Sequence, residues 1–337
     1  MAAGIEDVAK RAGVSIATVS RSLRGLPDVA ASTRDRVLTA ARELDYVASP
    51  FAARLASGRT ATVGVVVPFV NRWFFAEVLG AFQSVLHAGG YDLLLYNLAD
   101  PAGRAEFFRE LPVRKRVDAL LIATLVLSES ESEALRGLDI PVGLLGFQQP
   151  GFHSTRIDDI AGARAAVRHL LALGHQRIAL VGGDTADPMR FTPPLHRRYG
   201  YLHALRHAGV AVDPDLEVLG YFTVDGGEHA MRSLLELPER PTAVFAESDE
   251  MAYGVMRAIR RAGLRLPEDI AVIGFDDHAS AQLMDLSTIR QPVVRQATDL
   301  AGRLLEAVGD PRCTPVATTL PTELVVRGST DEAKSVY

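Results

Sequence analysis

The sequence predicts a protein of mixed α and β structure, with a small all-α headpiece, a short hinge and a large body of two lobes built on parallel sheets. Two observations predict this fold. Residues 5–44 show helical periodicity only, in short segments interrupted by glycine. From Thr62 onward, apolar runs of strand length alternate with amphipathic helices, and the alternation begins again after Asp158. Strands that alternate with helices form parallel sheets covered on both faces.

The first helical pair spans Ile5 to Leu23. Apolar residues at positions 5, 8, 9 and 12 fall at helical spacing, Gly13 breaks the helix, and a second short amphipathic segment follows. This is the pattern of a helix-turn-helix, in which the second helix enters a groove of DNA. The candidate DNA-binding side chains of this segment are Ser15, Ile16, Ala17, Thr18, Ser20 and Arg21.

A third helix must support the first two, because helices this short bury no core alone. We expect Ser32 to begin it, since its hydroxyl can cap the free backbone amides. An apolar stripe of Val37, Ala41 and Leu44 then follows. These elements complete a three-helix headpiece over residues 1–46.

Residues 47–60 are predicted to form a hinge. They are rich in Ala, Ser, Arg and Gly, which makes them too polar for a core. Ser49 and Pro50 are placed as the cap and first residue of a short helix ahead of 51–56. A helix of this length is stable only when something packs against it, so we expect it to form conditionally.

The body is expected to contain two series of strands and helices. Two consecutive series of similar layout predict two lobes, with a small ligand bound between them at the carboxyl ends of the strands. Three of the helices are expected to end on a left-handed glycine, at Gly89, Gly174 and Gly263. The expected strands are 62–67, 91–96, 119–123, 142–145, 177–181, 243–246 and 270–274, and the expected second-series helices are 161–173, 195–207, 227–237 and 250–262.

The distribution of charge fits one end of the chain meeting DNA. The chain of 337 residues has a net charge of -5, but residues 1–60 carry +3 and the remainder carries -8. A basic end on an acidic body is expected where only that end contacts phosphate. No apolar run approaches the length needed to cross a bilayer, and acidic residues stand where a signal peptide would be apolar, so we expect a cytoplasmic protein with no membrane contact. The only cysteine, Cys313, excludes an intrachain disulfide.

With headpiece, hinge and double body in order, the chain resembles a full-length member of the LacI/GalR family of bacterial transcriptional repressors. The resemblance covers essentially the whole sequence, and its motifs occur in the family's order. The residues that carry it are 7–15 with 17–21, 74–77, 173–175, Arg197 with Gly200, 273–277, 289–292 and 323–330.

The resemblance implies a periplasmic-binding-protein-like body and a repressor that a sugar-like effector releases from a near-palindromic operator. It also implies an oligomer, and we expect a homodimer because no heptad repeat follows Thr330. The expected body covers 61–330, with a first lobe of about 61–159 and 291–320, a second lobe of about 160–290 and 321–330, and a tail at 331–337.

The resemblance also assigns roles at the DNA. Paired hinge helices of the family enter the minor groove, where a leucine wedges between bases, and this leucine corresponds to Leu55. In the headpiece, Arg21 can bind the O6 and N7 atoms of guanine, and Ile16 and Ala17 can contact a thymine methyl. An alternative is that some of these side chains only solvate their helix.

In the cleft, the resemblance places Phe74 and Phe75 on the first lobe. Arg and Asp side chains can bind vicinal hydroxyls of a sugar, and an aromatic face covers its apolar side. The alternatives are a salt bridge between the lobes for the charged pair and plain core for the aromatic residues. The expected effector-binding residues are Phe74, Phe75, Arg197, Phe222, Asp276 and Gln291. Gly146 and Ser248 replace polar residues common in the family, which predicts a less polar pocket.

Two other classes of protein were weighed. A solute-binding protein for uptake shares the two-lobed body but requires an export signal in place of the headpiece. An enzyme is disfavoured because the sequence has no dinucleotide-binding glycine motif after a strand, no Walker phosphate loop and no nucleophile elbow. The aspartate pairs and scattered histidines lack the close spacing of metal ligands, so no metal or cofactor is expected.

Overall fold

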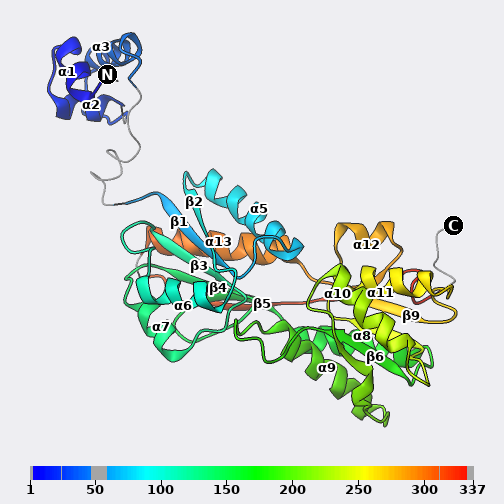
Figure 1. Cartoon of the computed structure of the whole chain (residues 1–337). Coiled ribbons are helices and arrows are strands. Elements are labelled where there is room, and N and C mark those ends of the chain that lie inside the picture. The colour runs from blue at the N-terminus through cyan, green and yellow to red at the C-terminus, as the bar shows by residue number, and fades with distance from the viewer. Residues whose placement is uncertain (1–2, 24, 47–58, 311, 332–337) are drawn as a thin grey trace. The chain divides into compact units, whose positions relative to one another are not determined.

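The structure of the protein, a computed structural model, describes residues 3–23, 25–46, 59–310 and 312–331 (Figure 1). Its residues group into two compact units, Met1–Thr62 with Lys115–Asp118, and Val63–Arg114 with Ala119–Tyr337. Most of the predicted hinge, including Leu55, lies outside the described residues.

Three helices form the headpiece of the first unit, as predicted. They are α1 (Ile5–Ala12), α2 (Ile16–Leu23) and α3 (Ala31–Glu43). Gly13 ends α1 with a φ of 66°, a left-handed conformation that glycine adopts without strain. The three helices enclose a small core of Val8, Ala9, Ala12, Val19, Val37, Ala40 and Ala41.

The predicted cap of the third helix was wrong by two residues. The helix α3 begins at Ala31, and the preceding Ala30 is the capping residue, which makes no side-chain hydrogen bond. Ser32 therefore lies inside the first turn. Its hydroxyl is two positions too late to act as the cap, which requires the last non-helical residue.

The first lobe of the second unit is a sheet with helices on both faces. Among the described residues its six strands run in the order β11-β5-β4-β3-β1-β2. The pairs β1–β3, β3–β4, β4–β5 and β5–β11 are parallel. The elements are β1 (Thr62–Val67), α5 (Trp73–Ala88), β2 (Asp92–Asn97), α6 (Pro101–Glu110), β3 (Ala119–Ala123), α7 (Glu129–Arg136), β4 (Val142–Leu145), β5 (His153–Ile157), α13 (Val293–Gly309) and β11 (Ala317–Leu320).

The second lobe repeats the plan. Its sheet has the order β12-β10-β9-β8-β6-β7 in the described part of the chain, with β12 antiparallel to β10. The elements are α8 (Asp159–Ala172), β6 (Ile178–Gly182), α9 (Pro193–His207), a 3₁₀ turn (Pro214–Leu216), β7 (Glu217–Leu219), α10 (Val224–Leu235), β8 (Ala243–Ala246), α11 (Asp249–Arg261), β9 (Ala271–Asp276), α12 (Ala279–Leu283), β10 (Ser287–Arg290) and β12 (Glu323–Val325).

Helices cover the sheets in pairs, as Figure 1 shows for α5 with α13 on the first lobe. Phe82 and Leu86 from α5 and Leu300 and Leu304 from α13 are fully buried against strands β1, β3 and β4. On the second lobe, α8 with α9 and α10 with α11 enclose the other two large cores. The described chain passes between the lobes after β5, after β10 and after β11.

Most predicted strands agree with the structure, and the differences are small shifts at the ends. Strands 62–67, 119–123, 142–145 and 243–246 have the predicted bounds. The glycine prediction was wrong at one helix. Gly89 has a right-handed φ of -82°, and the left-handed residue is Gly90, with a φ of 76°. Gly174 and Gly263 have the predicted positive φ.

No helix of the described residues is long and apolar enough to cross a membrane.

Candidate functional site

The outer face of α2 is the candidate surface for DNA. The first turn of α2 leaves Ile16 and Ala17 exposed, and Arg21 is exposed one turn further along. Val19 between them is completely buried in the headpiece core, which fixes the orientation of the helix. An exposed isoleucine on a helix that also presents an arginine is a surface suited to base edges.

Hydroxyl groups organise the start of the same helix. The Ser15 hydroxyl accepts a hydrogen bond from the Thr18 backbone amide at 3.1 Å and lies 2.9 Å from the Thr18 hydroxyl. Ser15 therefore caps α2. Thr18 and Ser20, which the sequence placed outward, are half-buried. The start of a helix carries the positive end of its dipole, and hydroxyl groups there can also donate, so this end of α2 suits a phosphate.

Arg21 already has a partner within the headpiece. Its Nη1 atom lies 3.6 Å from Oδ2 of Asp28, and both side chains are more than half exposed. An exposed ion pair of this kind contributes about 0–1 kcal/mol, so it is readily exchanged for a stronger bidentate contact. Asp28 thus competes with any guanine or phosphate that Arg21 would bind.

A cavity of about 220 Å³ lies between the two lobes of the second unit. It opens at the carboxyl ends of strands from both sheets, because Thr124, Ile157, Gly183 and Asp276 lie at or just beyond the ends of β3, β5, β6 and β9. All six predicted effector-binding residues line it, namely Phe74, Phe75, Arg197, Phe222, Asp276 and Gln291.

Arg197 is held rigidly by its own lobe. Its Nε atom donates to Oδ1 of Asp159 at 2.8 Å, and Nη1 donates to the carbonyl of Glu247. The guanidinium stacks on the Phe275 ring at 3.6 Å from the centroid. Asp159 itself stands at the start of α8, directly after the capping residue Asp158, which accepts from the Ala161 amide. An arginine fixed in this way presents its remaining edge to the cavity without loss of conformational entropy on binding.

Asp276 stands 3.6 Å from Arg197, measured from Oδ1 to Nη1, and accepts from Nε2 of Gln291 at 2.6 Å. Arg197 and Asp276 both belong to the second lobe, so the alternative of a salt bridge between lobes was wrong. Burial raises the pKa of Asp276, while Arg197 and then Gln291 oppose the rise. A carboxyl group that holds its proton so readily can act as donor or acceptor toward a hydroxyl of a ligand.

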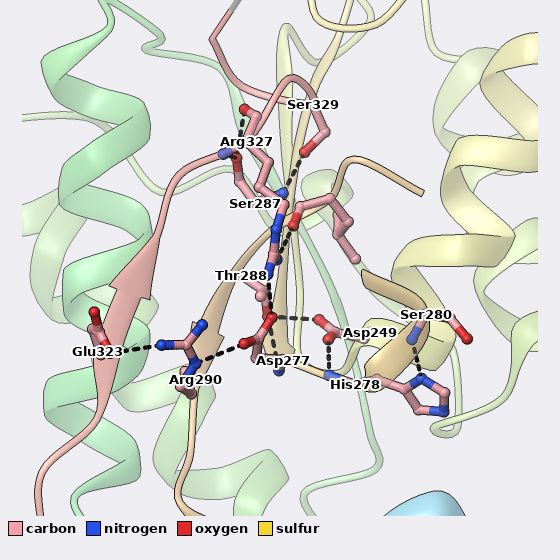
Figure 2. Close-up of polar contacts among 11 residues, drawn as sticks. Asp249, Asp277, His278, Ser280, Ser287, Thr288, Arg290, Glu323, Arg327 and Ser329 are labelled. Carbon is pink, nitrogen blue, oxygen red and sulfur yellow. Dashed lines mark hydrogen bonds and ion pairs between the residues drawn. The ribbon is translucent and has the colours of Figure 1, made fainter. Parts of the chain in front are cut away.

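The turn that carries Asp276 is fixed by a polar network (Figure 2). Asp277 is held by Arg290 and by Arg327, each at 2.7 Å. The His278 backbone amide donates to Asp249 at 2.8 Å. Asp276 and Asp277 have positive φ values of 128° and 57°, a conformation that costs a non-glycine residue free energy and persists only where neighbours impose it. The network therefore secures the direction of Asp276.

Aromatic rings form much of the remaining wall. Phe222 meets Phe191 edge to face, with centroids 5.4 Å apart, and Phe74 meets Phe75 in the same way at 5.3 Å. Phe75 is also part of the first-lobe core and is only 2% exposed, so for this residue the core alternative also holds. Phe74 is half-buried and borders the open space. Such rings cover an apolar ligand face.

Sequence reasoning missed several residues of the cavity. Ser248 was noted only as a substitution; it caps α11 by accepting from the Met251 amide and also lines the cavity. Gly146 does not line it. Its φ of 85° and its closeness to Thr124 leave no room for a side chain there. The missed lining residues are Phe69, Arg72, Thr124, Ile157, Asp159, Gly183, Asp184, Asp187, Phe191, Pro193, Pro194, Tyr221 and Glu250.

Carboxyl groups outnumber guanidinium groups around the cavity. Five aspartate or glutamate side chains line it, against two arginines, and no lysine or histidine is among the described lining residues. Arg197 is already paired with Asp159, and Arg72 donates to backbone carbonyls. The carboxyl residues are Asp159, Asp184, Asp187, Glu250 and Asp276. No group of three or more His, Cys, Asp or Glu within the described ranges could hold a metal ion.

Comparisons with known proteins agree with this layout. Residues 4–49 match the model of bacterial regulatory proteins, lacI family, and residues 167–330 match the periplasmic binding protein-like domain. The HTH-type transcriptional repressor CytR of Escherichia coli (strain K12) is 34% identical over 334 residues, which make up 98% of this chain and 96% of CytR. The chain belongs to the lacI family of bacterial regulatory proteins.

Solved structures of transcriptional regulators share the fold over almost the whole chain. The lac repressor dimer bound to operator and the anti-inducer ONPF superposes with a TM-score of 0.86 at 28% identity, covering 98% of this chain and 99% of that one. A complex of the transcriptional regulator CelR with cellobiose has a TM-score of 0.71 at 31% identity and covers 97% of this chain and 99% of CelR. The two-lobed body of this lacI-family chain is therefore the fold that its sequence predicted.

Proposed function

We propose that this protein represses transcription by occupying an operator with its headpiece and that a small molecule bound between the lobes controls the occupancy. The observation that carries the proposal is that one chain joins an exposed recognition helix to a second unit with a cavity between two lobes. An allosteric regulator requires two distinct sites, which here are the recognition helix and the cavity. Binding, and no catalysis, is the activity proposed.

At the operator, we assign base contacts to Arg21, Ile16 and Ala17 and phosphate contacts to the start of α2, where Ser15, Thr18 and Ser20 lie. The headpiece of one chain would read one half-site, and a homodimer would read both. The proposal of a dimer is supported by the lac repressor, which is a dimer in its complex with operator. A regulator that acts on chromosomal DNA in a bacterium works in the cytoplasm. Leu55 remains a proposal for a minor-groove wedge, supported by the resemblance alone.

In the cavity, we assign Arg197 and Asp276 to the hydroxyl groups of the effector, with Gln291 orienting Asp276. Phe74, Phe75 and Phe222 would cover its apolar faces. The excess of carboxyl groups, with both arginines already paired, disfavours a phosphorylated or otherwise anionic ligand, because like charges in a partly buried site repel. We therefore propose an uncharged, sugar-like effector, which fits the cellobiose bound by CelR.

Footprinting of the purified protein on its own promoter region tests the operator. Protection of a near-palindromic site is expected, and its absence with and without candidate ligands would contradict the proposal. A thermal-shift screen of sugars, nucleosides and sugar phosphates tests the cavity, because a ligand that binds only the folded state raises the melting temperature. Uncharged compounds are expected to stabilise the protein, and their phosphorylated counterparts are expected to have no effect.

A further inference from the structure

Two adjacent residues of the first lobe reach across the cleft to the second lobe. Arg72 is the last residue before α5, and Trp73 is the first residue of that helix. Nη1 of Arg72 donates to the carbonyl of Tyr221 at 3.1 Å and to the carbonyl of Phe222. The Trp73 ring lies against the His278 ring, with centroids 4.9 Å apart.

The segment that Arg72 contacts is a strained turn of the cavity wall. Tyr221 and Phe222 both have positive φ values, 52° and 55°, which side chains other than glycine rarely adopt. The Phe222 ring packs closely on Gly183, where an added Cβ would come within 2.3 Å of the ring. Two charge-assisted hydrogen bonds from one guanidinium hold the carbonyls of this turn, and with them the Phe222 ring.

Arg72 also faces a carboxyl group of the second lobe. Glu250 lines the same cavity, and its charge raises the pKa of Arg72 against the lowering by burial. In return, Arg72 opposes the rise in the pKa of Glu250 that burial causes. The guanidinium is thus a counter-ion for the cavity as well as a donor to its wall.

Trp73 contacts a second turn of the cavity wall, the one that carries Asp276. His278 follows Asp276 and Asp277, and that turn is tied to the second lobe through Asp249, Arg290 and Arg327 (Figure 2). Because the turn is fixed to its lobe, it cannot move toward Trp73 by itself. The tilted contact of Trp73 with His278 is therefore a contact between the two lobes, and opening the cleft would break it.

We propose that Arg72 is a positioning residue that holds the cleft closed by fastening the Phe222 turn to the first lobe, with Trp73 reporting the closure. This inference rests on the proposed function, because it names the residues that couple the effector site to the first lobe. The two turns that present Phe222 and Asp276 to the cavity are the turns that residues 72 and 73 contact. A displacement of either turn would therefore move the start of α5. This helix packs along α13 over the first sheet.

The chain provides its own reporter, since Trp73 is its only tryptophan. Opening the cleft removes His278 from the indole ring and exposes the ring to water. We expect Arg72→Gln to shift Trp73 emission to longer wavelength and to increase its quenching by acrylamide. Loss of two hydrogen bonds from a charged donor lowers the closed-to-open ratio by roughly 100-fold, counting about tenfold for each.

Two further variants make the result specific. Arg109→Gln also removes an arginine from the first lobe, but Arg109 is exposed and its hydrogen bond is with neighbouring Glu110, so emission should not change. Arg72→Lys keeps the charge opposite Glu250 and is expected to give intermediate quenching, because an ammonium group is a poor substitute for the planar fork. Should Arg72→Gln fail to fold by circular dichroism, Arg72→Lys decides the question.

Unchanged emission and quenching in the folded Arg72 variants would overturn the proposal, and so would an equal change in Arg109→Gln. Footprinting of the same preparations separates this outcome from a failure of the proposed function. If the wild-type protein protects an operator while the Arg72 variants keep the wild-type fluorescence, the result contradicts only the positioning role of Arg72. If the wild-type protein protects no DNA, the repressor function falls whatever the fluorescence shows.

Discussion

Glu247 offers a quantitative test of the electrostatics beneath the cavity. Its side chain follows β8, is only 1% exposed, and accepts from the Gly183 amide at 2.9 Å. Burial raises the pKa of Glu247 from 4.5 to about 8, against the opposing effects of the Gly183 hydrogen bond and the Arg197 charge. The change to test is Glu247→Gln, which imitates the protonated carboxyl and cannot ionise.

The direction of the effect follows from the two states. Between pH 4.5 and about 8 the folded protein keeps a proton on Glu247 that the unfolded chain has already lost. The free energy of unfolding of the wild type therefore falls as pH rises through this window and levels off above it. The full change is on the order of 5 kcal/mol, at 1.36 kcal/mol for each pKa unit. Glu247→Gln lacks this loss.

The assay is urea unfolding followed by Trp73 emission, together with thermal melting, at pH 5, 6, 7, 8 and 9. We expect the stability of Glu247→Gln relative to wild type to increase steadily with pH, by roughly 10 °C in melting temperature if 1 kcal/mol corresponds to about 2 °C in a chain of this size. Glu239→Gln, at an exposed position, is the control for loss of one charge. A stability difference that stays constant from pH 5 to pH 9 would refute the reasoning.

Four other substitutions test the proposed DNA contacts, the effector site and the packing of the first lobe. Arg21→Ala should weaken operator binding by roughly 10- to 100-fold, the worth of one bidentate base contact, and leave the ligand-induced thermal shift unchanged, whereas Arg42→Ala, which removes an arginine from α3 and not from α2, should leave the sequence preference unchanged; retained specificity of Arg21→Ala in a gel-shift assay would count against the assignment. Asp28→Asn should raise operator affinity up to about fivefold by freeing Arg21, and a decrease would show that the pair does not compete. Asp276→Ala should abolish the thermal shift by the effector while the footprint persists, so an unchanged dose response would place the ligand elsewhere. Phe82→Ala should lower the free energy of unfolding by about 3–5 kcal/mol in urea, since a fully buried ring leaves a cavity, and a loss below 1 kcal/mol would be inconsistent with the packing of α5.

The spacing of apolar residues predicted most helices and strands correctly, because the formation of each element depends mainly on residues close together in the sequence. Val8 and Ala12 are buried in α1 where helical spacing placed them, and several strands of apolar residues have the predicted bounds. The errors are also local. Gly89 and Gly90 are adjacent, and either could have ended the helix. In the structure Gly90 takes the left-handed conformation, with a φ of 76°, while Gly89 stays right-handed and packs against Leu305.

The cavity was predicted only in part, for a physical reason. The resemblance located six of its residues, but it gave no indication that Arg72 reaches carbonyls about 150 positions further along the chain. Backbone carbonyls carry no sequence signature, so a side chain that binds them is invisible to motif reasoning. Asp28 was likewise missed as a partner of Arg21, because the pair depends on how the loop after α2 returns to that helix.

The crossing of the chain between lobes has a consequence for biosynthesis. The first sheet is closed at one edge by β11 and the second sheet by β12, and these strands are only two residues apart in sequence, at 317–320 and 323–325. A growing chain that has made everything up to α13 still lacks an edge strand in both lobes. The two lobes are therefore finished by the same short segment, and a frameshift or truncation before residue 317 damages both together. A truncated product that keeps the headpiece but lacks these strands would therefore carry two incomplete sheets.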